Sequence, residues 1–168
     1  MKFLLTVMMA AAAMAACLNM PANAAAGDKS EIEALENQFA AAFNAKDVDA
    51  IMKVYVQGPS LFVFDVTPPR QHVGSDDYRK DWQAGLAMFK GPIKFELSDV
   101  AVTAVGDVGY GHSIQRVTGT DTKGKAVDVT VRVSDVYRKL AGKWLIVEEH
   151  VSVPVDLDTG KADLTSAP

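Results

Sequence analysis

The sequence predicts an α+β domain in which three helices pack on the concave face of a strongly curved antiparallel sheet. Up to about residue 90, apolar residues recur at spacings of three and four, which is typical of amphipathic helices. From Ile93 onward they alternate with polar residues, as in half-buried strands. Helices followed by a run of strands favour an α+β architecture, and a cone made of a curved sheet and helices has a pocket at its mouth.

Residues 1–24 are predicted to be a secretory signal peptide that does not belong to the domain. Lys2 supplies a basic start, an apolar run continues to about Leu18, and residues 22–24 form a small-x-small cleavage site. The run is shorter than the roughly 20 residues that a spanning helix needs, so we expect no membrane span. The expected location is periplasmic or secreted. An alternative is a lipoprotein signal, in which Cys17 is lipidated.

Composition limits the classes of function. Cys17 is the only cysteine, so a chain cleaved after Ala24 has no disulfide and no thiolate chemistry. The net charge of −4, without a Lys/Arg-rich block, argues against a nucleic-acid-binding surface. The expected partner is a small molecule or a protein. The three histidines lack the spacing of zinc ligands, so we expect no metal and no other cofactor.

The predicted elements follow the chain in a simple order. The first helix starts with a capping box of Ser30 and Glu33, and the next two are capped by Asp47 and Ser75. The three helices are expected at 31–44, 48–56 and 76–90, with a strand at 61–66 and a loop at 67–74. Four long strands are expected at 93–105, 108–120, 126–139 and 143–153. The domain should span residues 25–154, followed by a flexible polar tail, 155–168.

The last predicted hairpin carries more polar residues than a plain core hairpin requires. With a three-residue loop at 140–142, Arg132 would lie opposite His150 and Ser134 opposite Glu148. One face would then be polar, and the other would carry Val133, Asp135, Leu145, Val147 and Val151. The predicted polar stripe consists of Arg132, Ser134, Glu148, His150 and Ser152.

Two interpretations of this stripe are open. Arg132 and His150, with Ser134 and Ser152, would line a cavity and hold an anionic or carbonyl-bearing ligand, because arginine offers a rigid fork of donors and histidine can change charge near neutral pH. Alternatively, the stripe is a structural network in which Arg132 pairs with Glu148 and His150 with Ser152, on a sheet face covered by a partner subunit.

The segments "FAAAFNAKDVDAIMKVY", "LFVFD", "HVGSDDYRKDW" and "VSDVYRKLAGKWLIVEEHVSVP" together resemble the NTF2-like superfamily, and within it the SnoaL-like proteins, or ketosteroid isomerase homologues. The resemblance implies a cone-shaped fold and a homodimer formed through the sheet. It also implies that Asp65 is a catalytic base and that Asp135 is the protonated acid of an oxyanion hole. Phe39 stands where the family's tyrosine is expected, so Tyr55 or Tyr110 would have to supply the missing hydroxyl.

Each candidate also has a structural interpretation. Asp65 precedes Thr67-Pro68-Pro69 and could be a turn former, Asp135 could pair with Arg138 or Lys139, and Trp82 could belong to the core or to a cavity wall. The predicted function is binding of a small apolar carbonyl- or carboxylate-bearing molecule, with isomerase-like proton abstraction next to a carbonyl. The alternative is a non-catalytic binding or dimerisation module.

Overall fold

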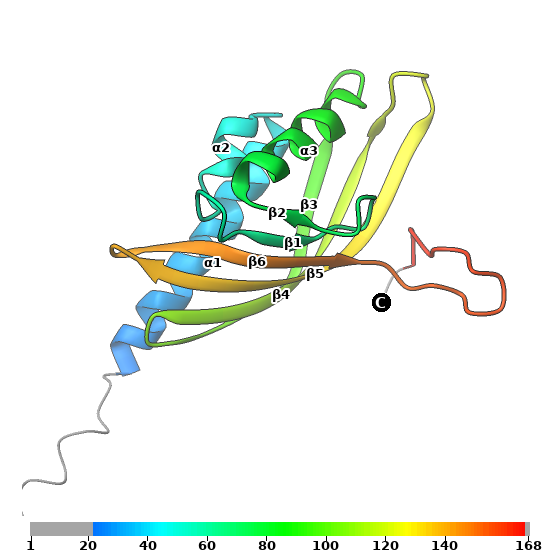
Figure 1. The fold of residues 1–168 in the computed structure, drawn as a ribbon. Helices are drawn as coiled ribbons and strands as arrows, with labels where there is room; N and C mark the ends of the chain where they lie inside the picture. Colours follow the sequence, from blue (N-terminus) through cyan, green and yellow to red (C-terminus); the bar gives the residue numbers. More distant parts are fainter. Residues whose placement is uncertain (1–21, 167–168) are drawn as a thin grey trace, which may run out of the picture.

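Three helices cover one side of a six-stranded sheet whose long strands bend sharply (Figure 1). The computed structural model describes residues 22–166, with side chains from residue 26 onward. The helices are α1 (Ala22–Asn44), α2 (Val48–Met52) and α3 (Ser75–Ala87). The strands are β1 (Phe62–Phe64), β2 (His72–Val73), β3 (Lys94–Val105), β4 (Val108–Thr120), β5 (Ala126–Leu140) and β6 (Lys143–Ser152). The α+β prediction is confirmed.

The first helix, α1, is longer than the sequence predicts. It begins at Ala22, so Ser30 lies inside the helix and is not its N-cap, which corrects the predicted capping box. Alanine has the highest helix propensity, and the alanines at 22 and 24–26 favour this extension. Ile32 and Phe39 are buried as their spacing predicts. Residues 1–21, which hold most of the predicted signal peptide, lie outside the described part of the chain.

The second helix, α2, is short because the residues that follow it pair with the sheet. Asp47 caps it as predicted, with its side chain accepting the Ala50 N–H at 2.9 Å. The helix ends at Met52, earlier than predicted, and Tyr55 forms a parallel bridge with Ile146 of β6. This pairing buries the Tyr55 side chain completely and anchors it next to β6.

The sheet has the strand order β2-β1-β6-β5-β4-β3, with β1 parallel to β6 and all other pairs antiparallel. The four long strands lie within one residue of their predicted limits, because glycine-containing turns separate them. The loop predicted at 67–74 instead contains β2, which pairs with β1. A two-residue strand carries too little pattern for periodicity to reveal it.

The turn between β5 and β6 differs from the prediction, and this changes the register. Leu140 pairs with Lys143 around the two residues Ala141 and Gly142, which both have positive φ as in a tight hairpin turn. The predicted three-residue loop is therefore wrong. Arg132 lies opposite Ser152, not His150, and Ser134 lies opposite His150, not Glu148.

A β-bulge further along β6 changes which residues are buried. Tyr137 pairs with Ile146 and Val136 with Glu148, so Val147 is an extra residue on β6. Before the bulge, Trp144 and Ile146 are the buried residues, and after it the buried residue is Glu149. The prediction that Leu145 and Val147 share the Asp135 face is corrected: Leu145 pairs with Arg138 on the outer face, and Val147 is the bulged residue.

The third helix lies on the concave side of the sheet, next to α2 and β2 (Figure 1). It runs from Ser75 to Ala87, so it ends three residues before the predicted limit. The Ser75 hydroxyl accepts the Gly58 N–H at 2.9 Å instead of capping the helix.

Beyond β6, the tail turns back on itself, and the Thr130 N–H donates to the Leu164 carbonyl at 2.7 Å. Within residues 22–166, no helix is both long and apolar enough to cross a bilayer.

Candidate functional site

A cavity of about 260 Å³ lies between α3 and the concave face of the sheet. Its wall is mostly aromatic and aliphatic, and includes Phe39, Phe43, Trp82, Leu86, Phe89, Phe95, Val117, Val127, Val129, Val131 and Val151. The acidic, amide and hydroxyl-bearing residues of the wall are Asp65, Thr67, Tyr78, Asp81, Gln115 and Glu149. An apolar cavity with a few convergent polar groups is the usual form of a small-molecule site.

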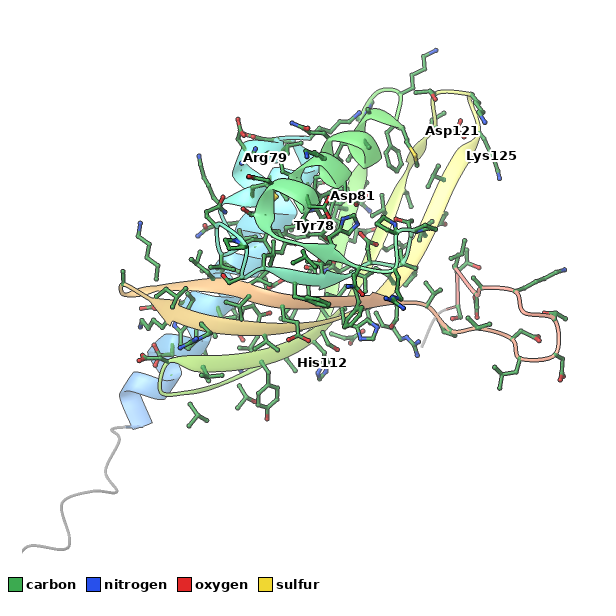
Figure 2. All side chains as sticks on the ribbon, viewed as in Figure 1. Tyr78, Arg79, Asp81, His112, Asp121 and Lys125 are labelled. Atoms are coloured by element: carbon green, nitrogen blue, oxygen red, sulfur yellow. The ribbon has the colours of Figure 1, made fainter. Side chains whose placement is uncertain are left out.

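Three elements supply the acidic and phenolic groups of the cavity. Asp65 directly follows β1, Tyr78 and Asp81 lie on α3, and Glu149 lies on β6 beyond the bulge. Residues three apart on a helix share a face, so Tyr78 and Asp81 both point from α3 toward the sheet (Figure 2). The Asp65 carboxylate also accepts the backbone N–H groups of Val66 and Thr67, so it ends the strand as well as facing the cavity.

Glu149 is the most enclosed acid of the cavity wall, with 4% of its surface exposed. Its two carboxyl oxygens accept hydrogen bonds from the Tyr78 hydroxyl at 2.6 Å and from the Tyr55 hydroxyl at 2.8 Å. Burial raises the pKa of Glu149 to about 7, although both hydrogen bonds act in the opposite direction. The carboxyl group can therefore give or take a proton near neutral pH.

Two further acids lie behind Glu149, in the protein interior. The Tyr137 hydroxyl donates to Glu36 at 2.9 Å and lies 3.4 Å from an Asp135 oxygen. Burial raises the pKa of Glu36, and it raises the pKa of Asp135 well above its usual range, with the charges of Glu149 and Glu36 adding to the effect. Among residues 22–166, no lysine or arginine pairs with these acids. Among the described residues, their side-chain partner is therefore a tyrosine hydroxyl and not a cation.

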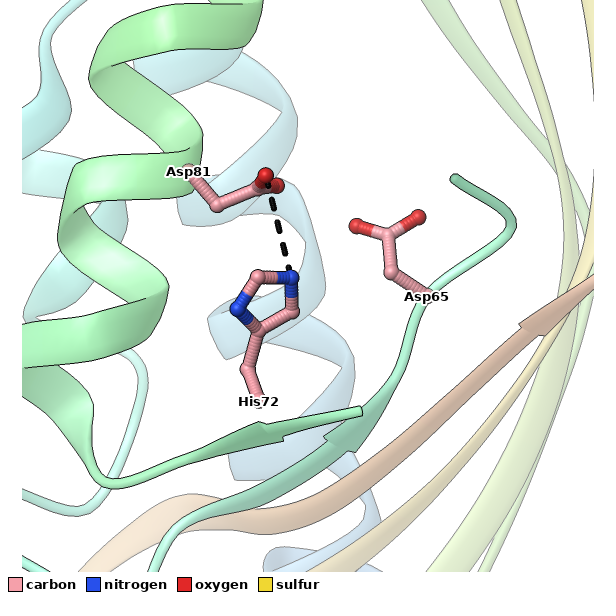
Figure 3. Close-up of side chains that lie close together, drawn as sticks. All are labelled: Asp65, His72 and Asp81. Carbon is pink, nitrogen blue, oxygen red and sulfur yellow. Dashed lines mark ion pairs between the residues drawn. The ribbon is translucent and has the colours of Figure 1, made fainter. Parts of the chain in front are cut away.

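Asp65 and Asp81 of the cavity wall form a second polar group with His72, which lies outside the wall (Figure 3). His72 is almost fully buried, with Nδ1 at 3.0 Å from Asp77 Oδ2 and Nε2 at 3.7 Å from Asp81 Oδ1. Burial raises the pKa of Asp81, and the charge of Asp65 raises it further. The carboxyl groups of Asp65 and Asp81 thus both face the imidazole of His72.

Only some of the predicted catalytic and aromatic residues line the cavity. Asp65 and Trp82 line the cavity, and Trp82 also packs against Phe39 with ring centroids 5.6 Å apart. Tyr55 lies outside the cavity wall, but its hydroxyl reaches Glu149. Asp135 is likewise outside the wall, and its neighbours are Tyr137, Glu36 and Glu149. Neither Arg138 nor Lys139 pairs with it in the described chain, since Lys139 binds Asp28 and Glu31 instead.

The predicted polar stripe lies on the outer face of the sheet, away from the cavity. Arg132, Ser134 and His150 are exposed because the alternation of β5 and β6 sends their inward-facing neighbours into the core. Ser152 pairs with Arg132 on the same outer face. The interpretation of these four residues as cavity-lining is corrected. The alternative pairs, Arg132 with Glu148 and His150 with Ser152, are also not formed among the described residues.

Phe39 lies in the cavity wall, so the site has no hydroxyl at that position. Tyr110 does not replace it, because 62% of its surface is exposed on the outer face. Tyr78 does bring a hydroxyl to the cavity, from α3 instead of α1. Sequence analysis missed Tyr78, Asp81, His72 and Glu149 as site residues. The i, i+3, i+4 spacing of Tyr78, Asp81 and Trp82 was the available signal, since it places two polar groups on the apolar stripe of α3.

Comparisons with known proteins show the family and the fold. The family model of the SnoaL-like domain matches residues 32–156. A search of curated proteins finds no match. An NTF2-like protein of unknown function from Pseudomonas putida KT2440 is 28% identical with a TM-score of 0.76, over 85% of this chain and 98% of that one.

Two other solved structures share the fold at lower identity. A ketosteroid isomerase-like protein from Erwinia carotovora atroseptica is 20% identical with a TM-score of 0.63, over 74% of this chain and 95% of that one. A scytalone dehydratase candidate from Novosphingobium aromaticivorans is 15% identical with a TM-score of 0.68, over 77% of this chain and 86% of that one.

Proposed function

Because the chain belongs to the SnoaL-like family, we propose that it binds a small, mostly apolar carbonyl compound and catalyses proton transfer next to the carbonyl group. The reaction class is that of an isomerase or a lyase. The observation that carries the proposal is the set of acids in an otherwise apolar cavity: Asp65, Asp81 and the Glu149–Tyr78 pair. The isomerase-like and dehydratase-like proteins that share the fold are consistent with this class.

The charge of the cavity favours a neutral carbonyl over a carboxylate as the bound group. Three of the described wall residues are acids, and none is lysine, arginine or histidine. A ligand carboxylate would therefore meet like charges without a compensating cation, which is unfavourable in a buried site. A carbonyl oxygen needs only hydrogen-bond donors, and the Tyr78 hydroxyl can supply one. The expected ligand is consequently uncharged.

The residues divide into a base and an oxygen-binding pair. Asp65 would take the proton from the carbon next to the carbonyl, leaving an enolate whose charge lies on the oxygen. The Tyr78 hydroxyl would turn from Glu149 to that oxygen, and Glu149 in its protonated form would donate through the same network. In an isomerisation, Asp65 returns the proton to a different carbon. In an elimination, a neighbouring hydroxyl leaves with a proton from Asp81.

Replacement of Asp65 tests the assignment of the base. The Asp65→Asn variant keeps the side-chain volume but cannot accept the proton, so we expect kcat/KM to fall by about 10²- to 10⁴-fold. The assay follows enone absorbance with a panel of β,γ-unsaturated ketones and β-hydroxy ketones. The matched control is Asp76→Asn, since Asp76 is an exposed aspartate in the first turn of α3 and should leave turnover unchanged.

Two results would contradict this proposal. Wild-type turnover in Asp65→Asn would exclude Asp65 as the base. A panel compound that raises the Tm of the wild-type protein without being converted would favour the non-catalytic binding module. Phe39, which stands in the place of the family's tyrosine, supports the non-catalytic alternative.

We further propose that the outer face of the sheet pairs with a second copy of the chain, as the resemblance implies. Val105, Val108 and Tyr110 are exposed on this face by 71%, 49% and 62%. Such a group of apolar side chains on one surface is typical of an interface. Light scattering should give twice the mass of the chain, and Tyr110→Arg should shift the protein toward monomer. A monomeric wild-type protein at high concentration would exclude this arrangement.

A further inference from the structure

Three side chains from separate segments converge at one edge of the cavity (Figure 3). Asp65 follows β1, His72 lies on β2 and Asp81 lies on α3. Each offers one ligand atom, and these atoms lie within 4.8 Å of one another. The pairing of β2 with β1 places His72 opposite Val63, two residues before Asp65. The arrangement is therefore built by the sheet and not by one flexible loop.

The orientation of His72 is fixed by its other ring nitrogen. Nδ1 lies 3.0 Å from Asp77 Oδ2, so Nδ1 carries the proton that is donated to this carboxylate. In this tautomer the Nε2 lone pair faces Asp65 and Asp81. His72 is only 4% exposed, and among residues 22–166 its Nε2 has no hydrogen-bond partner. Metal-binding histidines are held by a carboxylate in the same way.

The distance between His72 and Asp81 suits a shared cation better than a shared proton. Nε2 lies 3.7 Å from Asp81 Oδ1, which is too long for a hydrogen bond. Two ligands at 2.0–2.2 Å from a tetrahedral zinc ion lie about 3.4 Å apart, and the three ligand atoms, which lie within 4.8 Å of one another, would have to approach by up to about 1.4 Å. Without a cation, two carboxyl groups and an imidazole lone pair face one another in a partly buried space. A positive ion would relieve this repulsion.

We propose that Asp65, His72 and Asp81 form a binding site for one divalent transition-metal ion, with Asp77 positioning the histidine. One imidazole and two carboxylates are a ligand set for zinc or manganese, since imidazole ligation disfavours calcium and magnesium and the set has no soft sulfur ligand. Three protein ligands leave at least one coordination position free, as in catalytic zinc sites. Since Asp65 and Asp81 line the cavity, that position faces the bound small molecule.

The inference rests on geometry and does not need the proposed reaction. It revises the expectation of no metal, which considered only the three histidines and not the two aspartates. A bound ion would make Asp65 a ligand and withdraw it as a base. If the proposed reaction occurs, zinc should therefore inhibit it.

The test measures metal binding directly, with no substrate present. The full chain without an affinity tag is stripped with a chelator and titrated with ZnCl₂ by calorimetry, and CoCl₂ is used for absorption spectra. We expect one Zn²⁺ per chain. Asp81→Asn should weaken binding at least 100-fold, and Asp77→Asn should weaken it about 10- to 100-fold through the loss of histidine positioning. The cobalt spectrum should show a tetrahedral or five-coordinate site that is lost in Asp81→Asn.

His112 provides the matched control, because it is an exposed histidine on the outer face of the sheet, away from α3 (Figure 2). His112→Ala should leave the zinc affinity unchanged. Thermal melts verify that each variant is folded. The proposal is overturned if Asp81→Asn, folded, binds Zn²⁺ as tightly as wild type, or if His112→Ala abolishes binding. It is also overturned if the wild-type chain binds no zinc at 1 mM, on the order of the weakest specific sites. None of these results bears on turnover by the metal-free protein.

Discussion

The protein should lose about 2 to 3 kcal/mol of unfolding free energy between pH 5 and pH 8 because of Glu149. Its pKa is about 7 in the folded chain, against an ordinary value of 4.5. A raised pKa means that the folded state holds its proton more tightly than the unfolded state. The stabilisation is therefore complete below about pH 4.5 and is lost as the pH rises through 7, at 1.36 kcal/mol for each unit of the pKa difference.

Glu36 and Asp135 should change the stability in the same direction, because burial also raises the pKa of each. Urea denaturation at pH 5, 6, 7 and 8 measures the effect. Glu149→Gln is the matched variant, since it keeps the shape and can still accept from one tyrosine, but it cannot ionise. Its profile should be flatter than that of wild type by about 2 kcal/mol. Stability that is constant or increases from pH 5 to pH 8 would show that these acids are ionised in the fold.

Phe39→Ala should destabilise the protein by about 3 to 5 kcal/mol, the usual cost of removing a buried phenylalanine. Phe39 is 3% exposed and meets four other aromatic rings edge-on, with centroid distances of 5.5 to 6.3 Å. These rings come from α1, α3, β3 and the segment after α2, so the substitution leaves a void where the helices meet the sheet. Edge-to-face contacts add to the loss of apolar burial.

Urea denaturation at one pH, compared with Leu157→Ala, checks this expectation. Leu157 is 94% exposed, so its truncation should change the unfolding free energy by no more than about 0.5 kcal/mol. A cost below about 1 kcal/mol for Phe39→Ala would mean that the cavity wall collapses around the missing ring. The aromatic cluster would then not be the rigid support of the cavity.

The sequence predicts the long strands of this fold well, for a definable reason. Positive-φ turns such as Gly106 mark their ends, and a strand of ten or more residues shows its alternation over many positions. The short elements are different. β2 has two residues and α2 has five, so each is stabilised by contacts with distant segments and not by a local pattern. Such contacts are not visible in the sequence.

The candidate site also depends on contacts between distant segments that the sequence does not reveal. Asp65 could be predicted to lie at the cavity because the family resemblance implies a base at the end of a recognisable strand. Glu148 and Glu149 are adjacent and chemically similar, so only the turn length and the bulge decide which one is buried. The predicted turn was one residue too long and the extra residue in β6 was not predicted, but the two errors cancel at Glu149, which lies on the Asp135 face in both registers. His72 was missed because the strand that positions it was expected to be a loop.

The bulge at Val147 makes the chemistry of the cavity depend on strand pairing as well as on composition. If Val147 were paired in a regular ladder, the alternation that buries Trp144 and Ile146 would continue to Glu148 and His150, and Glu149 would turn to the outside. An imidazole would then take the place of an acid in the interior, although no side chain had been substituted. A change of strand pairing alone could therefore replace one buried carboxyl group by an imidazole within the same architecture.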